Sequence, residues 1–139
     1  MAEVLVTTRS GLTVDISARQ HKLVGDEPLP EGMDLGPGPY ELLLSALGAC
    51  TAMTVRMYAA RRSWPLEGVD VRLVHERVHA RDCADCETRD VMLDKVTKEL
   101  TLRGPLEEAQ RARLVEISER CPVQRTLQRS VTIETQVVA

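Results

Sequence analysis

An uncharged apolar segment near the middle of the sequence restricts the fold more than any other feature. No residue from position 42 to position 55 carries a charge, and Arg56 ends the run. Its apolar side chains recur at helical spacing, so we predict a helix over residues 40–61. One stripe of this helix would carry Leu43, Leu47, Cys50, Thr54 and Met57. Because a helix that is apolar on every side belongs in a protein interior, we expect it to form the buried axis of the fold.

Gly48 lies inside this helix among Ala46, Ala49 and Ala52. A glycine in a helix interior is less favourable than alanine by about 1 kcal/mol. Its presence therefore predicts that another backbone approaches the helix closely. The neighbour could be the chain's own sheet or a helix of a second subunit, and the sequence leaves both open.

Alternating apolar and polar residues predict strands on both sides of the helix. Residues 4–8 and 13–18 surround a short glycine-containing turn and predict a β-hairpin. Residues 25–39 hold four prolines and four glycines, which predicts a surface loop with solvated acidic side chains. Further strands are expected over residues 69–79, 91–103 and 130–138, and a second helix over residues 105–120. The order β-β-α-β-β-α-β predicts one two-layer α+β domain over residues 1–139.

Composition argues against several classes of protein. The net charge of −3 lacks the basic excess of a nucleic-acid-binding protein, and aromatic residues make up only 2% of the chain. The central apolar run is shorter than the ~20 residues that span a bilayer, so we expect no membrane span. The first residues do not resemble a secretory signal, which predicts a cytoplasmic protein. Four cysteines are too few for a disulfide scaffold, and a reducing compartment would keep them as thiols unless they cycle.

Cys50 lies deep in the predicted central helix, where burial would raise the pKa of its thiol. A reactive thiolate would therefore need a cation nearby, and the candidates are Arg9, Arg19 and Arg125. The alternative is that Cys50 is only a small core residue, which is the more common fate of a buried cysteine.

Cys121 precedes Pro122 at the end of the second predicted helix. A thiol at such an irregular position has room to move, as a resolving cysteine requires. Without Cys50, a helix-end cysteine with no role would be the better interpretation. Because 71 residues separate the two cysteines, any pairing would depend on the tertiary fold. Together they suggest thiol redox chemistry.

Two segments of the chain resemble a known family. Residues 36–54, Gly-Pro-Gly-Pro-Tyr-Glu-Leu-Leu-Leu-Ser-Ala-Leu-Gly-Ala-Cys-Thr-Ala-Met-Thr, and residues 119–127, Glu-Arg-Cys-Pro-Val-Gln-Arg-Thr-Leu, are similar to the OsmC/Ohr family of osmotically inducible and organic hydroperoxide resistance proteins. The resemblance implies an OsmC-like fold, with antiparallel sheets around long central helices in an intertwined homodimer. It also implies active sites at the subunit interface and thiol-dependent reduction of organic hydroperoxides.

On this resemblance Cys50 attacks the peroxide and becomes a sulfenic acid, which Cys121 converts to a disulfide. A dithiol such as a lipoyl group, or a small thiol, would reduce the pair again. No metal or organic cofactor is expected. We select Arg9 as the activating cation.

The sequence departs from the better-known branches of the family at two positions. Their Asn-Pro-Glu stretch, whose Glu helps to hold the activating arginine, is replaced by Gly38-Pro39-Tyr40, and Glu41 follows one position later. Nine helical residues cover about 14 Å, so Glu41 would act on Cys50 through an arginine or a bend. Gln124 stands where many relatives carry histidine, which removes a titrating group near Cys121.

A second cysteine pair, Cys83 and Cys86, lies between two predicted strands, downstream of His75 and His79. These four residues could ligate zinc, although a single CxxC motif is a weak signal. The pair could also be an auxiliary redox site, but a solvated strand connection is favoured. Two other functions therefore stay open: a non-catalytic protein that binds zinc or a small apolar ligand, and a redox sensor that passes its disulfide to a partner.

Overall fold

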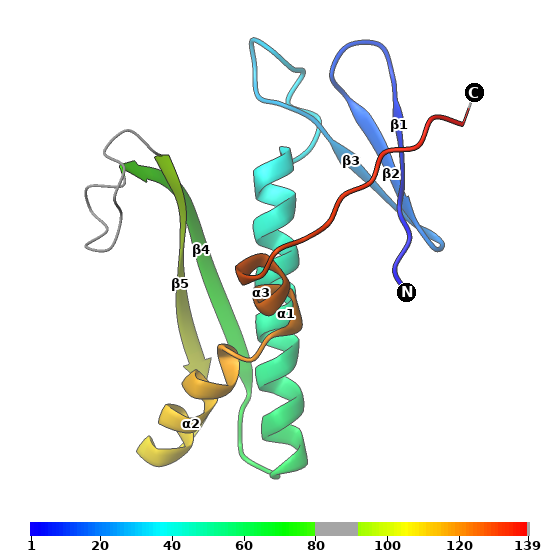
Figure 1. The fold of residues 1–139 in the computed structure, drawn as a ribbon. Helices are drawn as coiled ribbons and strands as arrows, with labels where there is room; N and C mark the ends of the chain where they lie inside the picture. Colours follow the sequence, from blue (N-terminus) through cyan, green and yellow to red (C-terminus); the bar gives the residue numbers. More distant parts are fainter. Residues whose placement is uncertain (80–91, 139) are drawn as a thin grey trace. The chain divides into compact units, whose positions relative to one another are not determined.

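The computed structural model describes residues 1–79 and 92–138. The chain packs as two compact units, Met1–Ser45 and Ala46–Ala139, and helix α1 (Pro39–Arg61) crosses the boundary between them. Both sheets are antiparallel, and helices accompany them (Figure 1). The predicted α+β class and the predicted central helix are confirmed. The expectation of a single domain stays a prediction.

The first unit contains a three-stranded sheet in the order β1 (Leu5–Thr8), β2 (Val14–Ala18) and β3 (His21–Gly25). The predicted hairpin is confirmed as β1 and β2, which pair antiparallel. The third strand was not predicted. Ala18 pairs with His21, so a two-residue turn joins β2 to β3, and Arg19 adopts a φ of 53° there. Because glycine or asparagine usually occupies such a position, the sequence gives no turn signal.

The loop after β3 is organised by the carboxylate of Asp26, which is only 3% exposed. It accepts hydrogen bonds from the Thr13 hydroxyl at 2.8 Å and from the backbone N–H groups of Glu27, Met33 and Leu35. Although burial raises the pKa of Asp26, these hydrogen bonds hold it below its usual value. The expectation that the acids of this loop are solvated is therefore wrong for Asp26.

Helix α1 is buried along one stripe only. The buried residues are Leu47, Gly48, Thr51, Val55 and Ala59. The other faces are open to solvent in the single chain, where Met53 is 63% exposed and Met57 is 54% exposed. The prediction of a helix buried on every side is wrong for the isolated chain, because the elements that pack against the helix cover only part of its circumference.

Strands β4 (Gly68–His79) and β5 (Met92–Arg103) form a long antiparallel hairpin beside α1 (Figure 1). The two strands pair from Gly68 and Arg103 to His79 and Met92, which confirms both predicted strands over their described residues. A Cβ atom added to Gly48 would lie 2.7 Å from Cδ1 of Leu73 on β4. The close approach at Gly48 is thus packing against the chain's own sheet, through a leucine side chain and not through a backbone as predicted.

The core of this second unit lies between α1, the hairpin and helix α2 (Glu108–Ser118). Its fully or almost fully buried members are Val55, Ala59 and Leu114, and partly buried side chains around them include Trp64, Val69, Leu100, Leu102 and Leu106. Helix α2 is shorter than predicted, because residues 105–107 precede its first turn. Gln110 accepts the backbone N–H of Glu107 at 2.9 Å and so fixes where the helix begins.

Two elements after α2 differ from the predictions. A third helix, α3 (Pro122–Gln128), follows directly, and Cys121 is its N-cap rather than the end of the preceding helix. Pro122 occupies the first helical turn, where the missing N–H of proline does no harm. The predicted strand over residues 130–138 is wrong, because no ladder pairs this segment within the described chain, and its apolar side chains are exposed.

Candidate active site

The fold brings Cys50 of α1 and Cys121 at the start of α3 together within the second unit. Both cysteines are free, and their side chains are hydrogen-bonded to each other. Cys50 is half-buried, whereas Cys121 is completely buried. Two thiols that are distant in sequence are therefore neighbours in space, as a redox pair requires.

Hydrogen-bond donors surround the sulfur of Cys121. The backbone N–H of Gln124 donates to it at 3.4 Å, and the Thr51 hydroxyl and the backbone N–H of Val123 also interact with it. Thr51 lies on the buried stripe of α1 and is itself inaccessible to solvent. Donors of this kind favour the thiolate over the thiol.

The two thiols have opposite pKa shifts. Burial raises the pKa of Cys50, and its hydrogen bond to Cys121 raises it further. Burial also raises the pKa of Cys121, but the hydrogen bonds from Cys50, from the Gln124 N–H and from the Thr51 hydroxyl outweigh it, so the pKa lies below its usual value. When the pair shares one proton, the negative charge therefore belongs on Cys121 and the proton on Cys50.

An apolar cavity of about 630 Å³ lies beside Cys50. Its lining is mainly apolar and includes Ala46, Ala49, Met53, Met57, Ile117 and Pro122, with Arg61 and Arg120 as its charged members. Cys50 belongs to this lining and Cys121 does not. A small apolar molecule in the cavity would therefore meet Cys50 first.

Arg9, the predicted activating cation, lies in the first unit and is paired with Asp15 on β2. Its Nε and Nη2 donate to the two carboxylate oxygens at 2.9 and 2.6 Å, and both side chains are about half exposed. The other candidates, Arg19 and Arg125, occupy the β2–β3 turn and helix α3. The role of Arg9 toward Cys50 stays a prediction.

Glu41 lies in the first turn of α1 and accepts the backbone N–H of Gly38 at 2.9 Å. This contact is one half of a capping box, in which the third helical residue reaches back to the N-cap. In the described chain no arginine pairs with Glu41. Its proposed action through an arginine stays a prediction as well.

Cys83 and Cys86 lie outside the described residues. His75 contacts Asp94 on β5 at 2.8 Å, while His79 is exposed at the end of β4. Within residues 1–79 and 92–138, no group of three or more His, Cys, Asp or Glu side chains could hold a metal ion.

Sequence reasoning missed two residues near the thiols, Thr51 and Lys98. Lys98 Nζ donates to the Thr51 hydroxyl at 3.2 Å. The sequence pattern nevertheless indicates that each of these two side chains faces the core. Thr51 is a polar residue four positions after Leu47 on the buried stripe, and Lys98 shares its strand face with Leu100 and Leu102, which pack against the core.

A long apolar helix, antiparallel sheets and two paired thiols define an α+β protein with a candidate redox centre. The chain belongs to the OsmC-like protein family, which matches residues 32–136. No curated protein matches the sequence. Helix α1 is long and apolar enough to cross a membrane by length and composition alone, but the core helix of a soluble protein passes the same test.

Solved structures of the family share the fold. An OsmC-like protein from Mycoplasma pneumoniae is 19% identical, with a TM-score of 0.75 over 92% of this chain and 87% of that chain. An organic hydroperoxide resistance protein from Legionella pneumophila is 20% identical, with a TM-score of 0.60 over 92% and 89%. The organic hydroperoxide resistance protein OhrB of Bacillus subtilis is 17% identical, with a TM-score of 0.55 over 92% and 90%. These likenesses confirm the predicted OsmC-like fold.

Proposed function

We propose that the protein is a thiol-dependent peroxidase that reduces organic hydroperoxides. The observation that carries the proposal is the hydrogen-bonded pair of free thiols, Cys50 and Cys121, beside an apolar cavity. Membership of a family that includes organic hydroperoxide resistance proteins supports it.

Exposure supports different roles for the two thiols. Cys50 lines the cavity and is therefore the peroxidatic cysteine, whereas the buried Cys121 is the resolving cysteine. The pKa of Cys121 is lowered and that of Cys50 is raised, so Cys121 is the thiol that loses its proton first. Cys121 thus acts as the base that accepts the Cys50 proton when the substrate arrives, and no metal or organic cofactor is needed.

The reaction takes place in two steps. In the first, the sulfur of Cys50 attacks the terminal oxygen of the hydroperoxide, an S–O bond forms and the O–O bond breaks. The leaving alkoxide takes the proton held by Cys121 and departs as the alcohol. In the second, the Cys121 thiolate attacks the sulfenic acid of Cys50, a disulfide forms and the departing hydroxide is protonated by solvent. The two thiols supply the two electrons that reduce the peroxide.

Reduction of the disulfide requires an external dithiol, of which a lipoyl group is one type, or a small thiol. The low aromatic content and the negative charge of the chain argue against nucleic acid as a partner. We propose a cytoplasmic location without membrane insertion. Arg9 and Glu41 are proposed to help activate Cys50, with Glu41 acting through the arginine.

We also propose that the protein works as an intertwined homodimer. Large apolar side chains are exposed on α1, at Met53 and Met57, and on the segment after α3, where Ile133 is 84% exposed. Exposed apolar patches of this kind mark interaction surfaces. The segment over residues 130–138 pairs with no strand among the described residues, so its backbone N–H and C=O groups are available to a second chain.

The proposal is tested by treating the reduced protein with stoichiometric cumene hydroperoxide or, separately, with hydrogen peroxide. Disulfides are then mapped over time by non-reducing peptide mass spectrometry. We expect rapid linkage of Cys50 to Cys121, faster with the organic peroxide because of the apolar cavity, and no linkage in the Cys50→Ser variant.

The double variant Cys83→Ser/Cys86→Ser is the matched control, because it removes two thiols but keeps the proposed pair. It should form the disulfide as fast as the wild-type protein. If Cys50 stays reduced while Cys83 and Cys86 oxidise, the proposed function is wrong.

A further inference from the structure

Lys98 places a positive charge on the core-facing side of β5. Its side chain is only partly exposed, and its Nζ donates to the Thr51 hydroxyl at 3.2 Å and to the Ser118 carbonyl at 3.1 Å. None of the ion pairs found in the described parts of the chain includes it. An ammonium group in this setting is stabilised only by dipoles, so its charge stays available to a nearby anion.

The hydrogen bonds around Thr51 have a fixed direction. An ammonium group can only donate, so the oxygen of Thr51 must accept from Lys98. The hydroxyl then has one hydrogen left, and the sulfur of Cys121 is an acceptor beside it. Because Thr51 is completely buried, no bulk water competes for this hydrogen. The chain of donors therefore runs from Lys98 through Thr51 to Cys121.

We propose that Lys98 is a positioning residue of the thiol pair, which acts through Thr51 to hold the negative charge on Cys121. The lysine fixes the hydroxyl as a donor to the sulfur and offsets the charge that a thiolate places in the interior. We call the chain of hydrogen bonds from Lys98 through Thr51 to Cys121 the relay. Its role in catalysis rests on the proposed function, because Cys121 is the proposed base and resolving thiol. The relay itself exists without a substrate and is measurable without one.

A purely structural role for Lys98 makes a different prediction. The Ser118 carbonyl lies at the C-terminal end of α2, where a lysine stabilises a helix by neutralising its last carbonyls. Loss of that contact would lower the stability of the fold but leave the ionisation of Cys121 unchanged. The deciding measurement is therefore the titration of the thiol.

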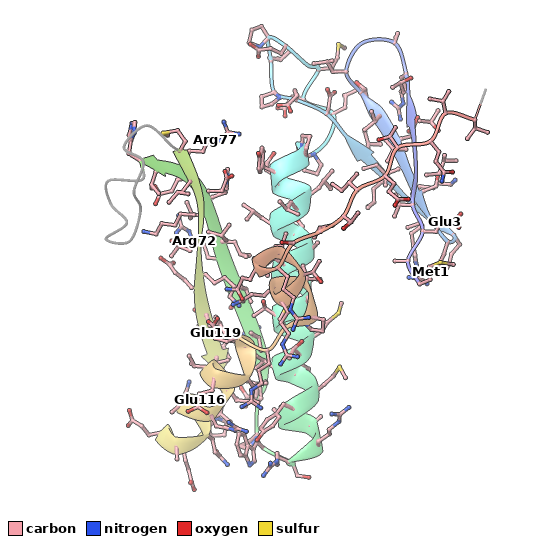
Figure 2. The ribbon with its side chains drawn as sticks, in the orientation of Figure 1. Met1, Glu3, Arg72, Arg77, Glu116 and Glu119 are labelled. Carbon is pink, nitrogen blue, oxygen red and sulfur yellow. The ribbon has the colours of Figure 1, made fainter. Side chains whose placement is uncertain are left out.

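Other charged and titratable groups near the pair lie on α1 and between α2 and α3. Arg61 of α1 and Arg120 line the cavity beside Cys50. The carboxylate of Glu119, a residue labelled in Figure 2, accepts a hydrogen bond from the Gln124 side chain. None of these three side chains has a hydrogen bond to Thr51 or Cys121 among the described residues. Within residues 1–79 and 92–138, Cys50 is the titratable group whose side chain is hydrogen-bonded to Cys121. None of these residues is replaced in the variants described below.

The test follows thiolate absorbance at 240 nm against pH in the reduced protein, in the Cys83→Ser/Cys86→Ser background so that only two thiols contribute. We expect the first thiolate to form below the usual thiol value near 8.5. Lys98→Met should raise this midpoint by about one pH unit, because an opposite charge close to a thiolate is removed. Thr51→Val, which removes the hydroxyl but keeps the lysine, should raise it as well.

Three variants serve as controls. Lys98→Arg and Thr51→Ser keep the charge and the hydroxyl, and their midpoints should stay closer to the wild type than those of Lys98→Met and Thr51→Val. Lys95→Met removes the same charge from the other face of β5, where the side chain is 59% exposed, and should leave the midpoint unchanged. Circular dichroism checks that each variant is folded.

The proposal is overturned if folded Lys98→Met titrates as the wild type does. If Lys98→Met does not fold, an unmoved midpoint in Thr51→Val overturns it. Consumption of cumene hydroperoxide, measured in parallel, separates the two proposals. A wild-type protein that consumes none, but whose midpoint moves in the variants, keeps the relay and contradicts the peroxidase. A wild-type protein that consumes the peroxide, with a midpoint that does not move in the variants, supports the peroxidase and contradicts the relay.

Discussion

The backbone N–H of Gln124 donates a hydrogen bond to the sulfur of Cys121 at 3.4 Å, so a thiol caps the first turn of α3. Oxygen-bearing side chains usually take this position. A sulfur atom here can serve the fold as a cap and, once ionised, gains from the same N–H. The cap and the candidate redox centre therefore share one atom.

Replacement of Cys121 should separate these two roles. Cys121→Ser keeps a side-chain acceptor for the Gln124 N–H, whereas Cys121→Ala removes it. We expect Cys121→Ala to be less stable than Cys121→Ser by about 1 kcal/mol, while both variants fail to form the disulfide. Urea unfolding under reducing conditions measures the difference. Equal stability of the two variants would show that the cap contributes nothing.

Gly48 should not tolerate a larger side chain. A Cβ atom added at this position would lie 2.7 Å from Cδ1 of Leu73, so a branched side chain must push the Leu73 side chain aside or displace β4 from α1. We expect Gly48→Val to lower the free energy of unfolding by about 1–3 kcal/mol. The double variant Gly48→Val/Leu73→Ala should recover part of this loss relative to Leu73→Ala alone. Strictly additive effects would contradict the contact.

Gln124 should be replaceable by a nonpolar side chain of similar length. Its Oε1 atom is buried without a hydrogen-bond partner among the described residues, while its Nε2 donates to Glu119. Gln124→Met loses that one hydrogen bond but also removes the unsatisfied oxygen. We expect the free energy of unfolding to change by less than about 1 kcal/mol, as measured by urea unfolding. A much larger loss would mean that the oxygen has a partner, such as a bound water.

Asp26 should stabilise the fold in a pH-dependent way. Its pKa is lowered in the folded protein, so its contribution is present above the unfolded value of about 3.9 and is lost as the pH falls through the folded pKa. The stability difference between the wild type and Asp26→Asn should therefore be largest near neutral pH and shrink below about pH 4. Urea unfolding at a series of pH values measures it.

Asp34→Asn is the matched control for Asp26, because Asp34 lies in the same loop but is exposed. Asparagine also tolerates the positive φ of 55° at this position. This variant should show no comparable dependence on pH. A pH-independent effect of Asp26→Asn would contradict the role of its carboxylate.

The predicted elements with long periodic patterns were confirmed, because each rests on many residues. Helix α1 and strands β4 and β5 belong to this group. Short elements depended on single residues whose meaning the sequence leaves open. Arg19 takes a turn position without a glycine, and Pro122 begins a helix where it suggested an end.

The candidate site was only partly predictable. The two cysteine motifs pointed to Cys50 and Cys121, but their contact depends on how α3 packs against α1. Which thiol carries the charge depends on hydrogen bonds from Thr51 and from the backbone of Gln124, and these arise only in the folded chain. The strand predicted over residues 130–138 was wrong for a similar reason, because alternation alone supplies no pairing partner.

The register between β4 and β5 determines which face of the sheet each β5 side chain occupies. Successive side chains of a strand point to opposite faces, so a one-residue shift of β5 against β4 would turn Lys98 away from α1 and bring its neighbour inward. A deletion of one residue ahead of Lys98 in β5 would thus be expected to disconnect the amine from Thr51, whereas a deletion of two would keep it on the correct side. An odd or even number of deleted residues in β5 would therefore decide whether Lys98 can stabilise a negative charge on the sulfur of Cys121.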